Sequence, residues 1–116
     1  MDSPDPTLLV VDDEEGMREV CADTLARLGA GVEVIKEGDP LRARDLLSAE
    51  TFDLLISDIR MPGLDGVSLL RHARERDPHL PVLMLTGFPT VETAVETLKL
   101  GAVDYITKPF LPDELL

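Results

Sequence analysis

The sequence predicts an α/β domain in which a parallel β-sheet carries helices on both faces. Five short apolar runs rich in β-branched residues recur along the 116 residues, and each run except the last is followed by the spacing of an amphipathic helix. Strands that alternate with helices favour a parallel sheet joined by right-handed crossovers. Two runs, "LLVV" and "VLML", are apolar throughout, as expected for strands buried on both faces.

The individual elements follow from these runs and from residues that begin or end helices. The strands are expected at residues 8–11, 32–35, 54–56, 82–85 and 103–106. The helix signals are Gly29 at the end of the first helix, Asp39 and Pro40 at the start of the second, Asp65 at the start and Pro78 beyond the end of the third, and Thr90 and Gly101 at the two ends of the fourth. The apolar sides are expected at Leu41, Leu46 and Leu47 of the second helix and at Val91, Ala94, Val95 and Leu98 of the fourth.

Length and composition limit the classes of function. The chain suffices for one domain, and 44% hydrophobic with 29% charged residues is typical of a globular protein. Acidic residues outnumber basic ones by 23 to 11, so the domain lacks the positive surface needed to bind nucleic acid directly. The opening "MDSPDP" does not resemble a signal peptide and no run could span a membrane. The lone Cys21 is expected in the core, and all of this fits the cytoplasm.

Chemically useful side chains follow the strands at one edge of the predicted sheet. In open α/β sheets, ligands bind beyond the carboxyl ends of the strands, so these side chains are expected to lie together. They are Asp12 and Asp13 after the first strand, Asp58 after the third, Thr86 after the fourth and Lys108 after the fifth.

Three carboxylates brought together repel one another, so either one of them holds a proton or a cation occupies the site. A divalent cation is the simpler solution. Oxygen ligands without a histidine or thiolate indicate Mg2+, which in turn implies a phosphoryl ligand. Because Asp12 and Asp13 are adjacent, one is expected to bind the metal directly and the other through water.

Asp58 is the best candidate for a nucleophile because it stands alone at its strand end. Attack by its carboxylate on a phosphoryl donor gives an acyl phosphate, a reaction in which the protein mainly positions groups and neutralises charge. Lys108 can pair with Asp58 and then with a phosphoryl oxygen, and the Thr86 hydroxyl can donate to another. For any one aspartate alone, a role in turn formation is the commoner explanation, so the prediction rests on the combination.

Other polar residues are assigned structural roles. Glu14 and Glu15 are expected in the first turn of the first helix, where their charge complements the helix dipole. His72 and His79 lack the paired spacing of metal ligands and are expected to be solvated.

The blocks "LLVVDDEEGMRE", "DLLISDIRMPGLDG" and "VLMLTGFPTVETAVETLKLGAVDYITKPF" resemble the receiver domains of bacterial two-component response regulators over nearly the whole chain. Within that family, the last block is most similar to receivers of nitrogen-regulatory-type transcription activators. The resemblance implies a flavodoxin-like, doubly wound sheet of five parallel strands in the order 2-1-3-4-5, and one receiver domain over residues 1–116.

The resemblance also implies a role for each matching residue. Asp58 would accept a phosphoryl group from a histidine kinase in the presence of Mg2+, and two switch residues would then move. The implied assignments are Asp58 as phosphoacceptor, Asp13, Asp58 and the Arg60 carbonyl as metal ligands with Asp12 as supporting acid, Thr86 and Lys108 as phosphate contacts, Thr86 and Tyr105 as switch residues, and a cis peptide between Lys108 and Pro109.

The implied function is a signalling switch, a regulatory phosphoacceptor and not a turnover enzyme, whose outer face changes its affinity for partners. The implied partners are a sensor histidine kinase and a C-terminal output region, an ATPase with a DNA-binding domain that controls transcription. Residues 111–116 resemble the start of a helix that the chain does not complete, so the final helix is predicted to be truncated and the chain to be a fragment of a longer regulator. The apolar surface left uncovered would favour a homodimer.

Three other functions compete with this interpretation. A vestigial module of the same fold would act through protein contacts without phosphorylation, and the intact set of reactive residues argues against it. A Mg2+-dependent phosphatase usually carries a second acid two residues after its nucleophile, where this chain has Arg60. A flavin or dinucleotide site would need a glycine-rich loop after the first strand, and the sequence has none there.

Overall fold

The computed structural model describes residues 6–28, 31–59, 61, 65–86 and 91–107. Strands and helices alternate along the chain, as the sequence predicts. The strands are β1 (Thr7–Val11), β2 (Glu33–Glu37), β3 (Leu54–Asp58), β4 (Val82–Thr86) and β5 (Asp104–Thr107). The helices are α1 (Glu15–Leu25), α2 (Pro40–Ala49), α3 (Gly66–Arg76) and α4 (Val91–Lys99), and a short 3-10 turn, η1 (Ala26–Leu28), follows α1.

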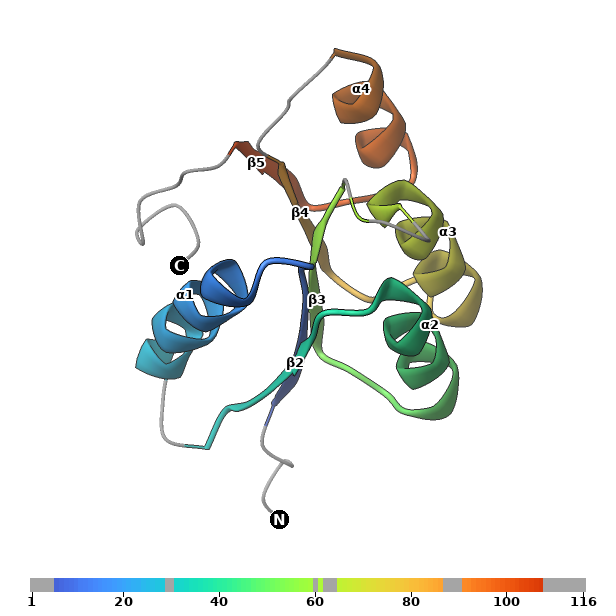
Figure 1. Cartoon of the computed structure of the whole chain (residues 1–116). Coiled ribbons are helices and arrows are strands. Elements are labelled where there is room, and N and C mark those ends of the chain that lie inside the picture. The colour runs from blue at the N-terminus through green and yellow to red at the C-terminus, as the bar shows by residue number, and fades with distance from the viewer. Residues whose placement is uncertain (1–5, 29–30, 60, 62–64, 87–90, 108–116) are drawn as a thin grey trace.

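The strands form one parallel sheet in the order β2-β1-β3-β4-β5. Figure 1 shows this sheet almost edge-on, with α1 on one side and α2 and α3 on the other. The arrangement confirms the predicted doubly wound α/β fold. β2 is the neighbour of β1 on one edge and β3 is its neighbour on the other, so the strand order reverses direction between β1 and β3. Sheets of this kind bind ligands at the carboxyl ends of the strands at such a switch point.

Four strands extend beyond their predicted ends, and β5 does so by one residue, Thr107. β2 lies further along the chain than predicted because its register with β1 continues to the pair of Val11 and Glu37. β3 includes Asp58 and β4 includes Thr86, since both residues keep their pairing with the next strand. Asp58 and Thr86 are therefore the last residues of their strands, whereas the prediction placed them beyond the strand ends.

Two apolar clusters lie on the two faces of the sheet. Because successive residues of a strand point to opposite faces, Leu55 contributes to one cluster and Ile56 to the other. The first cluster is closed by residues of α2 and α3 and the second by residues of α1, including Cys21. Cys21 is fully buried, which confirms its predicted place in the core.

The predicted helix signals are confirmed at four of the helix ends, including that of α3, which ends at Arg76 just before Pro78. The Asp39 Oδ1 accepts a hydrogen bond from the backbone N–H two residues later (2.9 Å), and the Asp65 Oδ1 accepts one from three residues later (2.8 Å). Gly101 has a φ of 86°, which a glycine adopts without strain beyond the end of a helix. The first helix differs, because α1 ends at Leu25 and η1 replaces its predicted last turn. Thr90, the predicted cap of α4, lies outside the described residues.

The predicted apolar sides of two helices are partly wrong. In α4, Val95 and Leu98 are exposed, whereas Thr97 is buried. The Thr97 side chain can be buried because its hydroxyl donates a hydrogen bond to the Ala94 carbonyl at 3.0 Å and therefore needs no water as a partner. In α2 the buried stripe starts at Pro40 and continues through the third and seventh residues after it, which leaves Leu41 facing outward. Despite this exposed apolar surface, no helix in the described ranges has the length and apolar character needed to cross a membrane.

Arg74 of α3 holds the C-terminal end of α4. Its Nε donates to the carbonyl of Leu100 at 2.8 Å, and its Nη2 donates to that of Gly101 at 2.9 Å. Carbonyls at the end of a helix lack intrahelical partners and attract a cation. We expect Arg74→Met to lower the free energy of unfolding by about 2 kcal/mol, since these two charge-assisted hydrogen bonds are lost together with longer ones from Nη1 to the carbonyls of Asp77 (3.3 Å) and Pro78 (3.5 Å).

The neighbouring Arg71 provides the control for this prediction. It also reaches α4, but through an exposed pair with Glu96 at 3.4 Å. Such pairs contribute little, so Arg71→Met should cost less than about 0.5 kcal/mol. Urea unfolding followed by circular dichroism measures both losses, and equal losses would contradict the proposed role of Arg74.

Candidate functional site

Three carboxylates meet at the switch point of the sheet. Asp12 follows β1 and Asp58 ends β3, and these two strands are neighbours that pair through Val11 and Ser57. One carboxylate oxygen from each of Asp12, Asp13 and Asp58 lies within 4.8 Å of the others. The fold thus brings together three residues that are distant or merely adjacent in the sequence.

The three carboxylates differ in their access to water. Asp12 and Asp58 are buried, with 1% and 5% of their surface exposed, whereas Asp13 is exposed. Negative charges held this close repel one another, and burial removes much of the hydration that would offset this repulsion. Carboxylate oxygens are hard ligands, so this group could hold a divalent cation such as Mg2+ or Ca2+.

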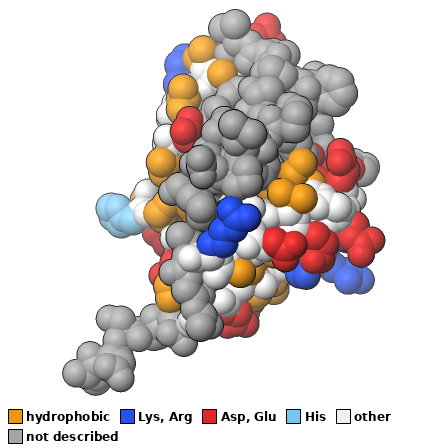
Figure 2. Space-filling view, turned by 90° about the vertical axis from the view of Figure 1, so that its left-hand side faces the viewer, with side chains coloured by type: hydrophobic (Ala, Val, Ile, Leu, Met, Phe, Trp, Pro, Cys, Tyr) orange, Lys and Arg blue, Asp and Glu red, His pale blue; other side chains and the backbone are white. Residues whose placement is uncertain are grey.

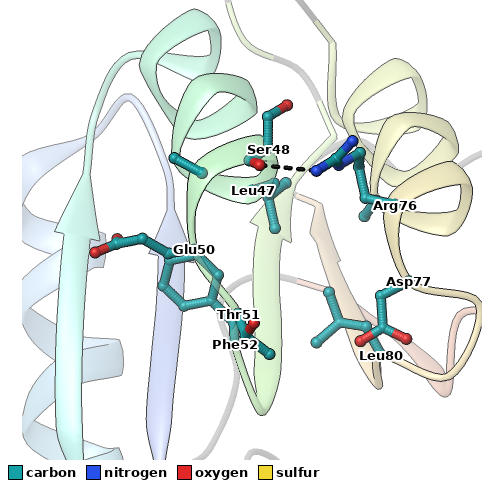
Figure 3. A pocket seen from close by; sticks show the side chains of 10 residues that line it. Leu47, Ser48, Glu50, Thr51, Phe52, Arg76, Asp77 and Leu80 are labelled. Atoms are coloured by element: carbon teal, nitrogen blue, oxygen red, sulfur yellow. Dashed lines mark hydrogen bonds between the residues drawn. The ribbon is translucent and has the colours of Figure 1, made fainter.

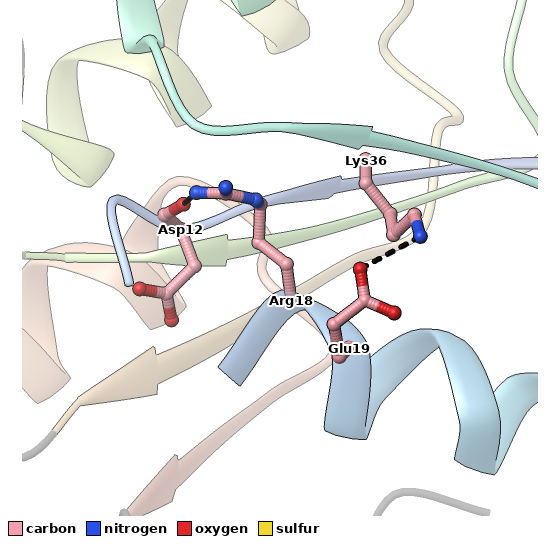
Figure 4. Close-up of polar contacts among 4 residues, drawn as sticks. All are labelled: Asp12, Arg18, Glu19 and Lys36. Carbon is pink, nitrogen blue, oxygen red and sulfur yellow. Dashed lines mark hydrogen bonds and ion pairs between the residues drawn. The ribbon is translucent and has the colours of Figure 1, made fainter. Parts of the chain in front are cut away.

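The loop after β1 is held at several atoms of Asp12. The Asp12 N–H donates to the carbonyl of Glu37 at 3.2 Å, which continues the pairing of β1 with β2. The Asp12 Oδ1 accepts a hydrogen bond from the N–H of Glu14 at 2.9 Å. The Nη1 of Arg18 donates to the Asp12 carbonyl oxygen at 2.7 Å (Figure 4). The carboxylate of Asp12 is therefore carried by a fixed segment of main chain.

The strand end that carries Asp58 is packed against the first turn of α3. The N–H of Ile59 donates to the carbonyl of Leu85 at 3.1 Å, which ties the strand end to β4. The N–H of Gly66 donates to the carbonyl of Ile59 at 2.7 Å, and the absence of a side chain at Gly66 permits this close approach. The side chain of Ser57 donates to the Asp58 carbonyl at 2.9 Å. Asp58 is thus positioned through its backbone from two sides.

Thr86 lies at the end of the neighbouring strand, β4, and its side chain is buried with 1% exposed. The pairing of Asp58 with Leu85 places Thr86 one residue further along the same sheet edge. The carboxyl ends of β1, β3 and β4 therefore carry two acids and one hydroxyl side by side.

Comparison with known proteins decides the family. The response regulator receiver domain family matches residues 8–116. This chain belongs to the receiver family of response regulators. The prediction made from its sequence blocks is confirmed.

The receiver is similar to curated response regulators over only part of their length. It is 44% identical over 109 residues to the response regulator protein FleR of Pseudomonas aeruginosa. This similarity extends over 94% of the present chain and 23% of FleR. It is 41% identical over 105 residues to the DNA-binding transcriptional regulator NtrC of Salmonella typhimurium. This similarity extends over 90% of the present chain and 22% of NtrC. The predicted likeness to nitrogen-regulatory-type receivers is confirmed, and the chain spans under a quarter of these curated relatives.

A solved structure resembles the receiver closely. It is a response regulator protein of Burkholderia pseudomallei, crystallised with a phosphorylated aspartic acid, a calcium ion and citrate. The two are 31% identical with a TM-score of 0.85, over 96% of this chain and 64% of the Burkholderia chain.

Several predicted site residues of the receiver lie outside the described residues. These are Arg60, Lys108 and Pro109. The backbone of Tyr105 lies in β5 and pairs with Met84 of β4, while the position of its side chain is outside the described part. The residues that the structure does place are Asp12, Asp13, Asp58 and Thr86.

The predicted structural roles of other polar residues hold for the most part. Glu14 is the N-cap residue of α1 and Glu15 lies in its first turn. His79 is exposed, as predicted, but His72 is half-buried, with its Nε2 2.9 Å from the Ser48 hydroxyl. Among the described residues, neither histidine belongs to the acidic cluster.

A cavity of about 270 Å³ lies between α2 and α3, and it contains none of the predicted site residues. Phe52 and Leu80 line it just before β3 and β4, so it lies at the amino ends of the strands, opposite the carboxylates. Figure 3 shows Arg76 beside it, with its Nη2 donating to the Ser48 carbonyl at 2.9 Å. The cavity therefore belongs to the junction of two helices and not to the acidic site.

The surface on the α1 side is rich in acids. Figure 2 shows acidic side chains gathered in one area of this face beside a few basic ones. Helix α1 contributes the exposed Glu15, Glu19 and Asp23, and Lys36 of β2 pairs with Glu19 at 2.8 Å. With a net charge of -12, the receiver as a whole attracts cations.

Three residues that matter for this geometry were not predicted from the sequence. Arg18 holds the Asp12 loop, Gly38 lies beside its guanidinium, and Gly66 permits the approach of α3 to Asp58. For Gly66, a glycine in the first helical position was a usable signal, because only a close approach favours it there. Arg18 and Gly38 carry no comparable signal.

Proposed function

We propose that this receiver is a phosphorylation-dependent signalling switch that accepts a phosphoryl group on Asp58 from a histidine kinase. The observation that carries the proposal is the convergence of the carboxylates of Asp12, Asp13 and Asp58 at the carboxyl ends of β1 and β3. Family membership and the likeness to the Burkholderia regulator with its phosphorylated aspartic acid support it.

Mg2+ is the metal proposed for the acidic cluster. Its ligands would be the carboxylates of Asp13 and Asp58 and the backbone carbonyl of Arg60, with Asp12 acting through water. The donor set fits, because the grouped residues offer only hard carboxylate oxygens. When bound, Mg2+ supplies positive charge that offsets the repulsion between these carboxylates and an incoming phosphoryl group.

Asp58 is the proposed nucleophile. One of its carboxylate oxygens attacks phosphorus, an O–P bond forms, and the bond from phosphorus to the kinase histidine nitrogen breaks. Lys108 would neutralise charge on the phosphoryl group, and the Thr86 hydroxyl would donate to one of its oxygens. Because Asp58 is consumed in each transfer, the domain acts stoichiometrically and is restored by slow hydrolysis of the acyl phosphate.

The proposed output of the site is a change in the outer face of the sheet. Thr86 ends β4, and β4 pairs directly with β5, which carries Tyr105. A movement of Thr86 toward the phosphoryl group would open space for the Tyr105 side chain, and the faces of α4 and β5 would change with it.

The proposed setting is a longer transcription regulator in the cytoplasm. Residues 1–116 would form its receiver domain, and a C-terminal ATPase and DNA-binding region would be its output, since similar regulators include NtrC. A sensor histidine kinase would be the phosphoryl donor. Exposed apolar side chains on α4 and before β5, Leu98 and Val103 among them, would support a homodimer.

The proposal is tested by intact mass after incubation with acetyl phosphate, with and without Mg2+, on the wild type and on Asp58→Asn. We expect the wild type to gain one phosphoryl group only when Mg2+ is present and Asp58→Asn to gain none. Asp45→Asn, which changes an exposed acid of α2, should behave as the wild type.

Two results would contradict the proposal. Phosphoryl addition to Asp58→Asn would place the acceptor elsewhere. A wild type that gains no phosphoryl group in any condition, including as the full-length regulator, would favour a vestigial module that acts through protein contacts alone.

A further inference from the structure

Arg18 contacts the main chain of the acidic loop and not its carboxylates. From the first turns of α1, its Nη1 donates to the backbone carbonyl oxygen of Asp12 at 2.7 Å. In Figure 4 the Asp12 carboxylate points away from the guanidinium group. The contact therefore acts on the shape of the loop more than on its charge.

Gly38 leaves the space in which this guanidinium lies. A Cβ atom at position 38 would lie 3.0 Å from Cζ of Arg18 and 2.5 Å from Nη1, and the second distance is closer than real Cβ atoms approach other atoms. The backbone itself does not need glycine there, because Gly101 is the one positive-φ glycine in the described part of the chain. The missing side chain at position 38 therefore accommodates Arg18.

Fixing the Asp12 carbonyl also fixes the start of Asp13. The peptide unit between these two residues is planar, so the direction of its carbonyl sets the plane that contains both Cα atoms. Asp12 and Asp13 supply two of the three clustered carboxylates, whose oxygens lie within 4.8 Å of one another. A rotation of this peptide unit would move the Asp13 carboxylate relative to that of Asp58.

We propose that Arg18, accommodated by Gly38, is a positioning residue for Mg2+ binding by the acidic cluster. The inference rests on the proposed function, because it concerns the same metal. Residues that orient metal ligands without touching the metal typically change its affinity by about 10–100-fold.

Charge alone predicts the opposite effect. Arg18 is positive, and removing a positive charge near a cation site reduces repulsion and tightens Mg2+ binding. Loss of positioning weakens Mg2+ binding, so the sign of the change in Mg2+ affinity distinguishes a positioning effect of Arg18 from an effect of its charge. Lys36 provides the control for charge, since this residue of β2 pairs at 2.8 Å with Glu19, the residue that follows Arg18 (Figure 4).

The experiment is calorimetric titration with MgCl2 of the wild type, Arg18→Met, Gly38→Ala, the double variant and Lys36→Met. We expect Mg2+ binding to weaken about tenfold in Arg18→Met and Gly38→Ala. The double variant should bind as Arg18→Met does, because Gly38→Ala acts only by displacing the guanidinium. Lys36→Met should bind Mg2+ as tightly as the wild type or more tightly.

Unfolding in urea without Mg2+ separates positioning from folding. Gly38→Ala displaces the end of a flexible side chain and loses its hydrogen bond to the Asp12 carbonyl, but it also restricts the unfolded chain. These two effects are each about 1 kcal/mol and opposite in sign, so the free energy of unfolding should stay within about 1 kcal/mol of the wild type. Its loss of Mg2+ affinity then cannot come from a damaged fold.

Each contrary outcome has its own meaning. Unchanged or tighter Mg2+ binding by Arg18→Met, with normal binding by the wild type, would overturn the inference and leave the proposed function standing. Additive losses in the double variant would overturn the role of Gly38. A wild type that does not bind Mg2+ would overturn both the inference and the metal site of the proposed function.

Discussion

Gly66→Ala is expected to destabilise the domain by about 3 kcal/mol or more, because the added methyl group has no space. Its Cβ would overlap the carbonyl oxygen of Asp58 and would lie 2.8 Å from the Cα of Ile59. Both atoms belong to the main chain at the end of β3, so no change of rotamer relieves the overlap. Either α3 or the strand end that carries the phosphoacceptor candidate must move.

Gly16→Ala is the matched control. Gly16 lies in α1, and apart from its chain neighbours and the backbone of its own helix no atom lies within 4 Å of the position its Cβ would take. Alanine restricts the unfolded chain and favours a helix, so this change should stabilise the domain by about 0.5–1 kcal/mol. Urea unfolding followed by circular dichroism compares the two variants. A loss below about 1 kcal/mol in Gly66→Ala would show that the strand end moves freely, contrary to the packing described here.

The same contact links the stability of the fold to the site. Gly66 is buried and begins α3, Asp65 caps that helix, and the Gly66 N–H bonds to the Ile59 carbonyl. Residues that start a helix thus also fix the backbone of Asp58. A variant at Gly66 that still folds is therefore expected to accept a phosphoryl group at Asp58, the proposed acceptor, more slowly than the wild type does.

The order of the elements could be predicted because each strand and helix repeats its own local pattern. The strand ends could not, since the apolar pattern stops at Ile56 and Leu85 while the main-chain pairing continues to Asp58 and Thr86. The outward face of α4 was also missed. A buried Thr97 satisfies its hydroxyl within the helix, so polarity alone does not reveal which side is covered.

The acids of the site could be predicted because each lies at the end of a strand, and parallel strands end at one edge of the sheet. Arg18 and Gly38 could not. Their contact depends on how closely the loop after β2 approaches α1, a distance that no local pattern encodes. What remained hidden was therefore the support around the clustered acids and not the acids themselves.

Asp13→Asn is expected to change the response to Mg2+ in two opposite ways. Without metal, the variant should unfold at a higher temperature than the wild type, because one of three carboxylates within 4.8 Å of one another no longer repels the others. With Mg2+ at a hundred times its dissociation constant, the wild type should gain about 2.7 kcal/mol, and Asp13→Asn should gain little. The order of the two melting temperatures should therefore reverse.

Thermal unfolding in EDTA and in MgCl2, at ionic strength matched with NaCl, measures this reversal and removes the effect of general screening. Asp45→Asn carries the same charge change on the exposed surface of α2 and should respond to Mg2+ as the wild type does. The reversal requires that the same carboxylate both destabilises the metal-free domain and binds the ion. If Asp13→Asn kept the full Mg2+ response, the ion would be held without Asp13, and the proposed role of Asp13 as a metal ligand would be wrong.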